Sequence, residues 1–367
     1  MVVTVQGGVD EAHMDRALAL AARGRGRTSP NPMVGSVVVS DQGEVVGSGF
    51  HARAGEAHAE VRALDEAGGR ARNGTLYCTL EPCSHTGRTG PCAPRIVDAG
   101  LRRVVIAVGD PHPRVAGAGV AYLRARGLQV DVGVRRAAAA RLNEVFLTWA
   151  TRRRPFVIVK IATSLDGRIA MRAGTRTPIT GAAAAAAVHR TRAEVDAIGV
   201  GSTTVLVDDP LLTARGAPRS RPLTRVVLDR RLRTPPGARM LRTLDAGPVL
   251  IVTTRRALRE QPAAADRLRA AGATLEPVES GTLTEAMTRL AELEVTSLLL
   301  EGGAAVHRAA WNSGVVDRVQ RYIAPHAFGG DGVPWLDDLV AVARLGAARV
   351  ERHGPDVLIQ GDVQRPD

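Results

Sequence analysis

The hydrophobic pattern of residues 1–150 changes repeatedly between the spacing of a helix and that of a strand. Residues 10–23 carry apolar side chains at helical spacing, whereas residues 75–80 alternate between Leu or Cys and Thr or Tyr. The same reasoning predicts helices over 58–67 and 91–99 and strands over 34–39, 44–50 and 103–108. Helices and strands in alternation predict a layered α/β domain that ends near residue 150.

A second α/β pattern starts after the basic linker 152–155. Gly302 and Gly303 form a turn between the last strand and the last helix of this pattern. The pattern predicts helices over 183–195 and 304–313 and strands over 156–161, 197–200, 225–229, 249–253 and 297–300. A chain of 367 residues is long for one compact domain. We therefore expect two domains, residues 1–150 and residues 151–367.

Composition excludes several classes of protein. The apolar fraction of 45% is sufficient for two hydrophobic cores. No apolar run approaches the roughly 20 residues of a membrane-spanning helix, and the N-terminus lacks the basic and apolar regions of a secretory signal. The three cysteines, which lie between Cys78 and Cys92, form no disulfide framework. These observations predict a cytoplasmic protein without a membrane partner.

The formal net charge of +12 raises the alternative of a nucleic-acid-binding protein. Nearly all basic residues are arginines spread over the whole chain, and Lys160 is the only lysine. No long basic run is interleaved with aromatic residues. We therefore expect no nucleic-acid partner. An RNA-binding module would instead show tight RNA binding with a steep salt dependence and no bound metal ion.

A histidine, a glutamate and two cysteines form the most specific pattern in the sequence. His58 and Glu60 are followed by Cys83 and Cys92, each of which comes directly after a proline. Catalytic zinc takes three protein ligands and leaves a fourth position for water, so His58, Cys83 and Cys92 are the candidate ligands. Bound zinc lowers the pKa of its water to roughly 7, and Glu60 would carry a proton from that water to a leaving amine. The pattern predicts hydrolytic deamination of a nitrogen heterocycle.

Three features refine this prediction. Residues two apart do not face the same way in a regular helix, so His58 and Glu60 both reach the metal only from the first turn of their helix. Cys78 lies on the apolar side of its strand and is predicted to be a core residue. Common zinc deaminases place two residues between the cysteines, whereas eight residues separate Cys83 and Cys92. We expect this longer loop to lie over the substrate.

The segments around these residues resemble a known family. The runs 29–35, 58–60 and 81–92 are similar to the bifunctional riboflavin-biosynthesis deaminase/reductase, and the long loop between the cysteines is specific to that branch of the deaminases. The resemblance implies a cytidine-deaminase-like α/β/α layered fold for residues 1–150, with Glu60 as the proton donor. The residues that it implies in contact with the pyrimidine or its ribose phosphate are Asn31, His51, His85 and Arg88.

Segments of the second half resemble the reductase domain of the same family, which has a dihydrofolate-reductase-like α/β fold. They are residues 160–168, 201–213 and 301–303. Small residues follow a strand in the second segment, and the pair Gly302-Gly303 precedes a helix, so both suit phosphate binding. Each glycine pair alone is more often an ordinary turn. Neither segment contains the G-x-G-x-x-G pattern of a Rossmann dinucleotide site.

The resemblance implies an NADPH site and a sugar-phosphate site in this half. The residues implied at the NADPH site are Ala162, Pro178, Thr204, Asp208 and Gly303. The residues implied at the sugar-phosphate site are Lys160, Arg176, Arg192, Leu212, Arg215 and Glu301. Two of these positions depart from the family. Pro178 replaces the usual tryptophan, and Arg176 replaces a small polar residue.

Together, the patterns and the resemblance predict an enzyme with two activities and two cofactors, Zn²⁺ and NADPH. It would deaminate 2,5-diamino-6-ribosylamino-4(3H)-pyrimidinone 5′-phosphate and then reduce the ribose of the product to a ribityl chain. The expected partner is this pyrimidine ribotide, and a homo-oligomer is expected. The alternative, which the departures at Pro178 and Arg176 favour, is a zinc deaminase of another pyrimidine with a degenerate or diverted reductase domain.

Overall fold

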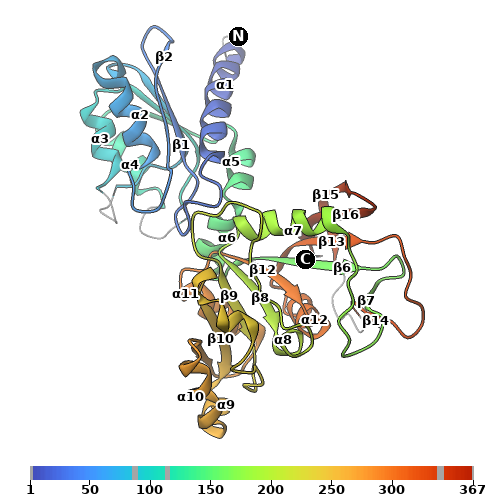
Figure 1. The fold of residues 1–367 in the computed structure, drawn as a ribbon. Coiled ribbons are helices and arrows are strands. Elements are labelled where there is room, and N and C mark those ends of the chain that lie inside the picture. Colours follow the sequence, from blue (N-terminus) through green and yellow to red (C-terminus); the bar gives the residue numbers. More distant parts are fainter. Residues whose placement is uncertain (1–2, 85–89, 112–115, 337–342, 366–367) are drawn as a thin grey trace. The chain divides into compact units, whose positions relative to one another are not determined.

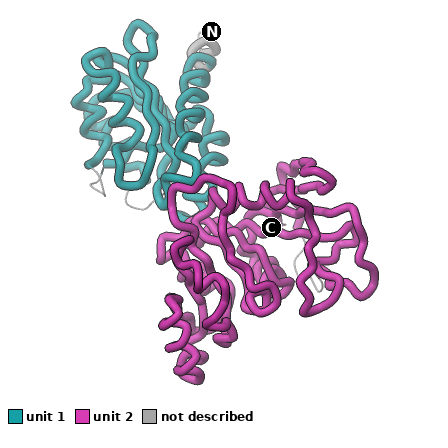
Figure 2. Tube along the Cα trace, viewed as in Figure 1, with its two compact units in different colours: residues 1–152 teal, residues 153–367 magenta. Residues whose placement is uncertain are grey.

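The computed structural model divides into two compact units, residues 1–152 and 153–367 (Figure 2). It describes residues 3–84, 90–111, 116–336 and 343–365. Each unit has its own sheet and its own hydrophobic core. Among the described residues, no helix is both long enough and apolar enough to span a bilayer.

The first unit contains a five-stranded sheet in the order β2-β1-β3-β4-β5 (Figure 1). Strand β1 is antiparallel to β2 and β3, whereas β3, β4 and β5 are parallel. The strands are β1 (Gly35–Val39), β2 (Val45–Phe50), β3 (Thr75–Leu80), β4 (Arg103–Val108) and β5 (Gln129–Val132). The helices are α1 (Val3–Ala22), α2 (Ala59–Ala67), the 3-10 turn η1 (Gly68–Ala71), α3 (Cys92–Asp98), α4 (Ala118–Arg124), α5 (Arg136–Leu142) and α6 (Glu144–Arg152).

Helices cover both faces of this sheet (Figure 1). Leu76 and Ile106 pack under α2, α3 and α4, whereas Tyr77 and Val105 pack under α1 and α5. Strand β3 is therefore buried on both sides, including the side on which its sequence places Thr and Tyr. Buried polar groups on that side need partners, and the hydroxyl group of Thr79 accepts a hydrogen bond from the backbone of Gly35 at 3.0 Å.

An ion-pair network attaches α1 to the sheet. Arg103 donates two hydrogen bonds of 2.8 Å to Asp10 and one of 2.7 Å to Asp131. The Tyr77 hydroxyl donates to Asp10 at 2.7 Å. Burial raises the pKa of Asp10, but the bonds from Arg103 and Tyr77 outweigh burial and lower that pKa below its usual value. The charged form of Asp10 therefore stabilises the first unit.

Replacing Asp10 with Asn should lower the free energy of unfolding of the first unit by about 3 kcal/mol, because Arg103 loses a buried carboxylate. Since the pKa of Asp10 is lowered in the folded state, its contribution is present above the unfolded value of about 3.9. It is lost as the pH falls through the folded pKa. Calorimetry of the full chain measures the effect. Asp15→Asn is the control, because Asp15 is 51% exposed and pairs with Arg135 at the surface. Equal losses in both variants would contradict the prediction.

The second unit contains a nine-stranded sheet in the order β11-β10-β9-β8-β12-β6-β13-β16-β15. The strands from β11 to β13 are parallel, and β16 is antiparallel to both β13 and β15. They are β6 (Phe156–Thr163), β8 (Ala197–Gly201), β9 (Thr224–Leu228), β10 (Val249–Thr254), β11 (Thr274–Val278), β12 (Ser297–Gly302), β13 (Val316–Ile323), β15 (Arg344–His353) and β16 (Asp356–Gln364). Strands β7 (Arg168–Ala170) and β14 (Val333–Pro334) form a separate antiparallel pair.

Helices also cover the parallel part of this sheet. Met287 and Leu290 of α11 and Ala310 of α12 belong to the same core as Val157 and Leu298 of the strands. The helices are α7 (Ala182–Glu194), α8 (Ser202–Asp208), α9 (Arg255–Glu260), α10 (Pro262–Ala270), α11 (Leu283–Glu292) and α12 (Ala304–Asn312), with 3-10 turns η2 (Arg239–Arg242) and η3 (Leu244–Ala246). Because parallel strands end at the same edge of a sheet, segments that follow β6, β8 and β12 meet there.

The predicted elements agree with the structure within two residues at each end, apart from the first helix. Helix α1 begins at Val3, well before the predicted start near Asp10. Valines and glycines of low helix propensity precede Asp10 in the sequence and concealed this extension. The sequence analysis left several further elements unpredicted, among them the helices α4, α5, α6 and α8 to α11 and the strands β5, β11, β13 and β16. It also missed β15, which is an edge strand with mostly exposed side chains and so lacks an apolar face.

Candidate active sites

His58, Cys83 and Cys92 lie together in the first unit. Their ligand atoms are all within 4.8 Å of one another. Nδ1 of His58 is 3.1 Å from Sγ of Cys92 and 3.6 Å from Sγ of Cys83. Zinc bonds of about 2.1 Å to nitrogen and 2.3 Å to sulfur separate tetrahedral ligands by roughly 3.5 Å. The three residues therefore fit a zinc ion.

Two helix starts bring these residues together. His58 is the N-cap of α2 and has an extended backbone (φ −67°, ψ 162°), and Glu60 lies in the first turn of the helix. This is the geometry that the spacing of His58 and Glu60 requires. Cys92 is the first residue of α3, and its backbone N–H donates to Sγ of Cys83 at 3.3 Å. Cys78 is fully buried in a separate apolar cluster, as predicted for a core residue.

The hydrogen bond between the two cysteines of the cluster shifts the pKa values of their thiols in opposite directions. The hydrogen bond from Cys92, and then the imidazole of His58, lower the pKa of the Cys83 thiol to about 4. The same bond to Cys83 raises the pKa of the Cys92 thiol far above its usual range. Zinc binds cysteine as the thiolate, so metal binding to this cluster would release a proton.

Glu60 is buried beside the ligands. Its side chain is 3% exposed, and its Oε2 has no hydrogen-bond partner in the part of the chain that the structure describes. Burial raises the pKa of this carboxyl group. Because an unpaired buried oxygen costs about 1–3 kcal/mol, it indicates a polar group that is bound there when the site is loaded.

Asn31 and His51 lie next to the cluster. The ring of His51 packs edge-on against that of His58, with the ring centres 5.4 Å apart. Nδ2 of Asn31 is 3.1 Å from Nε2 of His51, and Nδ1 of His51 is 3.4 Å from the carbonyl oxygen of Ala57. In this arrangement Nε2 of a neutral His51 imidazole accepts a hydrogen bond from Asn31. Burial lowers the pKa of His51, which favours this neutral form. His85 and Arg88 lie outside the described residues.

Replacing Cys92 with Ser should reduce zinc affinity at least about 100-fold, because a neutral hydroxyl group replaces a thiolate ligand. Metal analysis after dialysis against a chelator measures the retained zinc. Cys78→Ala is the matched control, because Cys78 is equally buried but belongs to the core. It should retain one zinc ion per chain. Retention of one zinc ion per chain by Cys92→Ser would show that Cys92 is not a ligand.

The second unit has a cavity of about 920 Å³. It opens where β6, β8 and β12 end, and it contains every residue that the resemblance implied for this half. These lining residues are Lys160, Ala162, Arg176, Pro178, Arg192, Thr204, Asp208, Leu212, Arg215, Glu301 and Gly303. The fold thus gathers segments that are far apart in the sequence. Their individual roles stay predictions.

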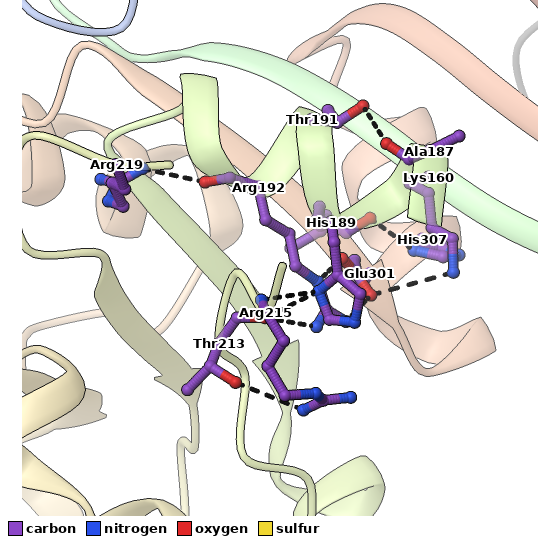
Figure 3. A network of polar contacts seen from close by, with 11 residues as sticks. Lys160, Ala187, His189, Thr191, Arg192, Thr213, Arg215, Arg219, Glu301 and His307 are labelled. Carbon is purple, nitrogen blue, oxygen red and sulfur yellow. Dashed lines mark hydrogen bonds and ion pairs between the residues drawn. The ribbon is translucent and has the colours of Figure 1, made fainter. Parts of the chain in front are cut away.

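Glu301 lies at the centre of a polar network in this cavity (Figure 3). Arg192 donates to it twice, from Nε to Oε1 at 2.6 Å and from Nη2 to Oε2 at 2.7 Å. Nζ of Lys160 is 3.8 Å from Oε2. Burial raises the pKa of Glu301, but Lys160 and Arg192 outweigh burial and lower it to about 2. Burial also lowers the pKa of Lys160, so this lysine gives up a proton more readily than an exposed one.

A second cavity of about 670 Å³ adjoins the first and shares part of its wall, including Thr203 and Gly303. Its apolar side includes Val252 and Val278. At its polar side, Nη2 of Arg233 donates to Ser202 at 2.8 Å and to Thr203 at 3.0 Å. The two adjacent cavities, one of which has an apolar wall and a guanidinium group, suit the two ends of a dinucleotide with a 2′-phosphate on its adenosine ribose.

Sequence reasoning missed three residues of the second unit, of which Arg233 lines the smaller cavity. Arg239 lines the larger cavity but follows no motif. His189 contacts the Thr213–Arg215 turn. Helical spacing could have identified His189, because it lies three residues before Arg192 in the same helix and residues at that spacing share a face.

Two family models match the two units of the chain. The model of the cytidine and deoxycytidylate deaminase zinc-binding region matches residues 8–108, and that of the RibD C-terminal domain matches residues 155–359. The riboflavin biosynthesis protein RibD of Aquifex aeolicus is 39% identical, over 96% of this chain and 98% of that protein. The RibD protein of Escherichia coli is 38% identical, over 95% and 98%. The chain belongs to the RibD family.

Solved structures of the RibD family have the same fold. Acinetobacter baumannii RibD matches with a TM-score of 0.86 at 34% identity, over 98% of this chain and 100% of that one. A deaminase/reductase of Thermotoga maritima matches with a TM-score of 0.82 at 32% identity, over 98% and 100%. The predicted fold class is confirmed, with a cytidine-deaminase-like domain followed by a dihydrofolate-reductase-like domain. The predicted pair of activities and the cofactors, zinc and NADPH, are confirmed as those of a RibD enzyme.

Proposed function

We propose that this enzyme deaminates a diaminopyrimidine ribotide at the His58–Cys83–Cys92 cluster and then reduces its ribose in the cavity around Glu301. The Thermotoga relative is described as a diaminohydroxyphosphoribosylaminopyrimidine deaminase and 5-amino-6-(5-phosphoribosylamino)uracil reductase. The substrate would be 2,5-diamino-6-ribosylamino-4(3H)-pyrimidinone 5′-phosphate. The observation that carries the proposal is the unpaired, buried Oε2 of Glu60 beside three zinc-type ligands.

The first step would be hydrolytic deamination. Zinc, when bound by His58, Cys83 and Cys92, supplies a water molecule that is nucleophilic at neutral pH. Glu60 accepts a proton from this water on its unpaired oxygen and delivers it to the departing amino group. The buried pair Asn31 and His51 would orient the pyrimidine, since the two side chains hold each other in place beside the metal ligands.

The second step would be reduction of the opened ribosylamine at its anomeric carbon. NADPH, when bound, supplies the hydride. Lys160 would supply the accompanying proton, because burial lowers the pKa of this ammonium group and Glu301 holds it at the cavity wall. The cavity orients the reacting carbon and excludes bulk water.

The two joined cavities would hold the two halves of NADPH. Thr204, Asp208 and Gly303 line the larger cavity, which would take the nicotinamide end. The apolar wall of the smaller cavity would pack against the adenine. Arg233, which bridges Ser202 and Thr203, would face the 2′-phosphate of the adenosine ribose that distinguishes NADPH from NADH.

Mass spectrometry of the products tests both steps. With the zinc-loaded enzyme and the diaminopyrimidine ribotide, we expect a product that has lost one amino group as ammonia. Addition of NADPH should then add two hydrogen atoms to it. A product that has lost only its amino group in the presence of NADPH would favour the alternative of a deaminase with a degenerate reductase domain. The observation that supports this alternative is that Pro178 and Arg176, which depart from the family, both line the larger cavity.

We also propose that the enzyme works in the cytoplasm as a homo-oligomer and binds no nucleic acid. The described cysteines are all free, which supports a reducing compartment. Sedimentation of the purified protein would measure the oligomeric state. An RNA-binding assay at increasing salt would test for a nucleic-acid partner.

A further inference from the structure

We propose that His189 is a positioning residue of the reductase half, which together with Arg192 holds the Thr213–Arg215 turn so that Arg215 is presented to the anionic end of the ribotide. This role rests on the proposed reductase function and adds to it a residue outside the cavity wall. His189 lies on α7 and contacts the turn (Figure 3).

Two side chains of α7 contact the carbonyl oxygen of Thr213. Nδ1 of His189 lies 3.1 Å from it, and Nη1 of Arg192 donates to it at 2.9 Å. Nδ1 of His189 also lies 3.2 Å from the backbone nitrogen of Arg215. A single ring nitrogen therefore contacts the turn on both sides of Ala214. It donates to Thr213 when it carries the hydrogen and accepts from Arg215 when it does not.

The loop before this turn needs such a support, because its backbone is strained. Leu212 has a φ of +53°, which is rare for a bulky side chain and costs about 1–3 kcal/mol. Its side chain is buried and lines the cavity. Strained backbone persists only where its surroundings hold it. Asp209 fixes the start of the loop by accepting from the backbone nitrogen of Arg239 at 2.8 Å, and His189 and Arg192 hold its end.

The guanidinium group of Arg192 is already engaged, which changes its expected role. Each of its three nitrogens is bonded to Glu301 or to the Thr213 carbonyl oxygen. Three of the five N–H donors of Arg192 thus hold Glu301 and the turn. Arg215 is exposed, and its Nη1 donates to the hydroxyl group of Thr213 over a longer distance of 3.3 Å. The geometry therefore points to Arg215 as the residue that meets the phosphate, and to His189 as the residue that sets its direction.

Three variants of α7 test this role in the full-length, zinc-loaded enzyme. With the deaminated ribotide and NADPH, His189→Ala should raise KM for the ribotide about 5- to 10-fold, with kcat changed less than about twofold. His189→Asn should restore most of the loss, because an Asn side chain places a polar atom near the position of Nδ1. Thr191→Ala should leave KM unchanged, because Thr191 bonds within the helix, to Ala187.

The NADPH affinity, measured by fluorescence, reports separately on the fold of the reductase unit. It should stay unchanged in all three variants. The proposal is overturned if KM is unchanged in His189→Ala, if the Asn and Ala variants behave alike, or if NADPH affinity falls together with ribotide affinity. A wild-type enzyme that oxidises no NADPH with the ribotide would refute the reductase function itself. Calorimetric binding of the ribotide to the same variants would then still decide whether His189 sets its affinity.

Discussion

Replacement of Glu60 with glutamine is expected to slow deamination about 10³-fold while zinc remains bound. Glutamine has nearly the same shape but cannot accept the proton of the attacking water or return it to the amine. The ligands His58, Cys83 and Cys92 are untouched, so the metal content should equal that of the wild type. The fold should not be weakened, because the variant removes a buried carboxyl group whose Oε2 has no partner among the described residues.

The rate of ammonia release from the ribotide measures this effect. Glu66→Gln is the matched control, because Glu66 lies on the same helix but is exposed and bonds to Ser48. Its deamination rate should match that of the wild type. Reduction of the deaminated ribotide should be normal in both variants. A Glu60→Gln rate within tenfold of the wild type would show that another group carries the proton.

Glu301→Gln is expected to slow NADPH-dependent reduction of the ribotide at least about 100-fold. It should also lower the free energy of unfolding of the second unit by about 3 kcal/mol. The variant leaves the mostly buried cations Lys160 and Arg192 without their carboxylate, and removing one partner of such a pair is strongly destabilising. Arg192 would also lose the contact that aligns it with the Thr213 carbonyl oxygen. Deamination in the first unit should continue.

Rates of NADPH oxidation and calorimetry of the full chain measure the two effects. Glu276→Gln is the matched control, because Glu276 is also buried and pairs with Arg289 at 2.9 Å, but it does not line the cavity. It should lower stability while it leaves reduction intact below the melting temperature. If the folded Glu276→Gln variant lost reduction to the same extent, the network around Glu301 would have no special part in the reaction.

The engagement of Arg192 also bears on the chain's departures from its family. If the guanidinium group of Arg192 is held by Glu301, other cations of the cavity bind the negatively charged group of the ribotide. Arg176, which replaces a small polar residue, and Arg239 both line that cavity. The departure at Arg176 is therefore compatible with anion binding and need not mark a degenerate reductase.

Regular elements could be predicted where one side of an element is apolar at a fixed spacing. The periodicity of α2 and the alternation in β3 located these elements closely. The same reasoning failed for β15, because an exposed edge strand carries no such pattern. It also placed the start of α1 too late, because the residues of its first turns have low helix propensity.

The sequence by itself determined the chemistry of the first site. Histidine, glutamate and two cysteines at this spacing suit a zinc-bound water with a proton carrier, so residue type and spacing were sufficient to name His58, Glu60, Cys83 and Cys92. Only the tertiary structure decided which cations of the second site are free to meet a ligand. Arg192 bonds to Glu301 across 109 positions of the chain, and His189 reaches the Thr213 turn across 24. Such contacts depend on how α7, β12 and a strained loop pack together, and local sequence patterns do not encode that packing.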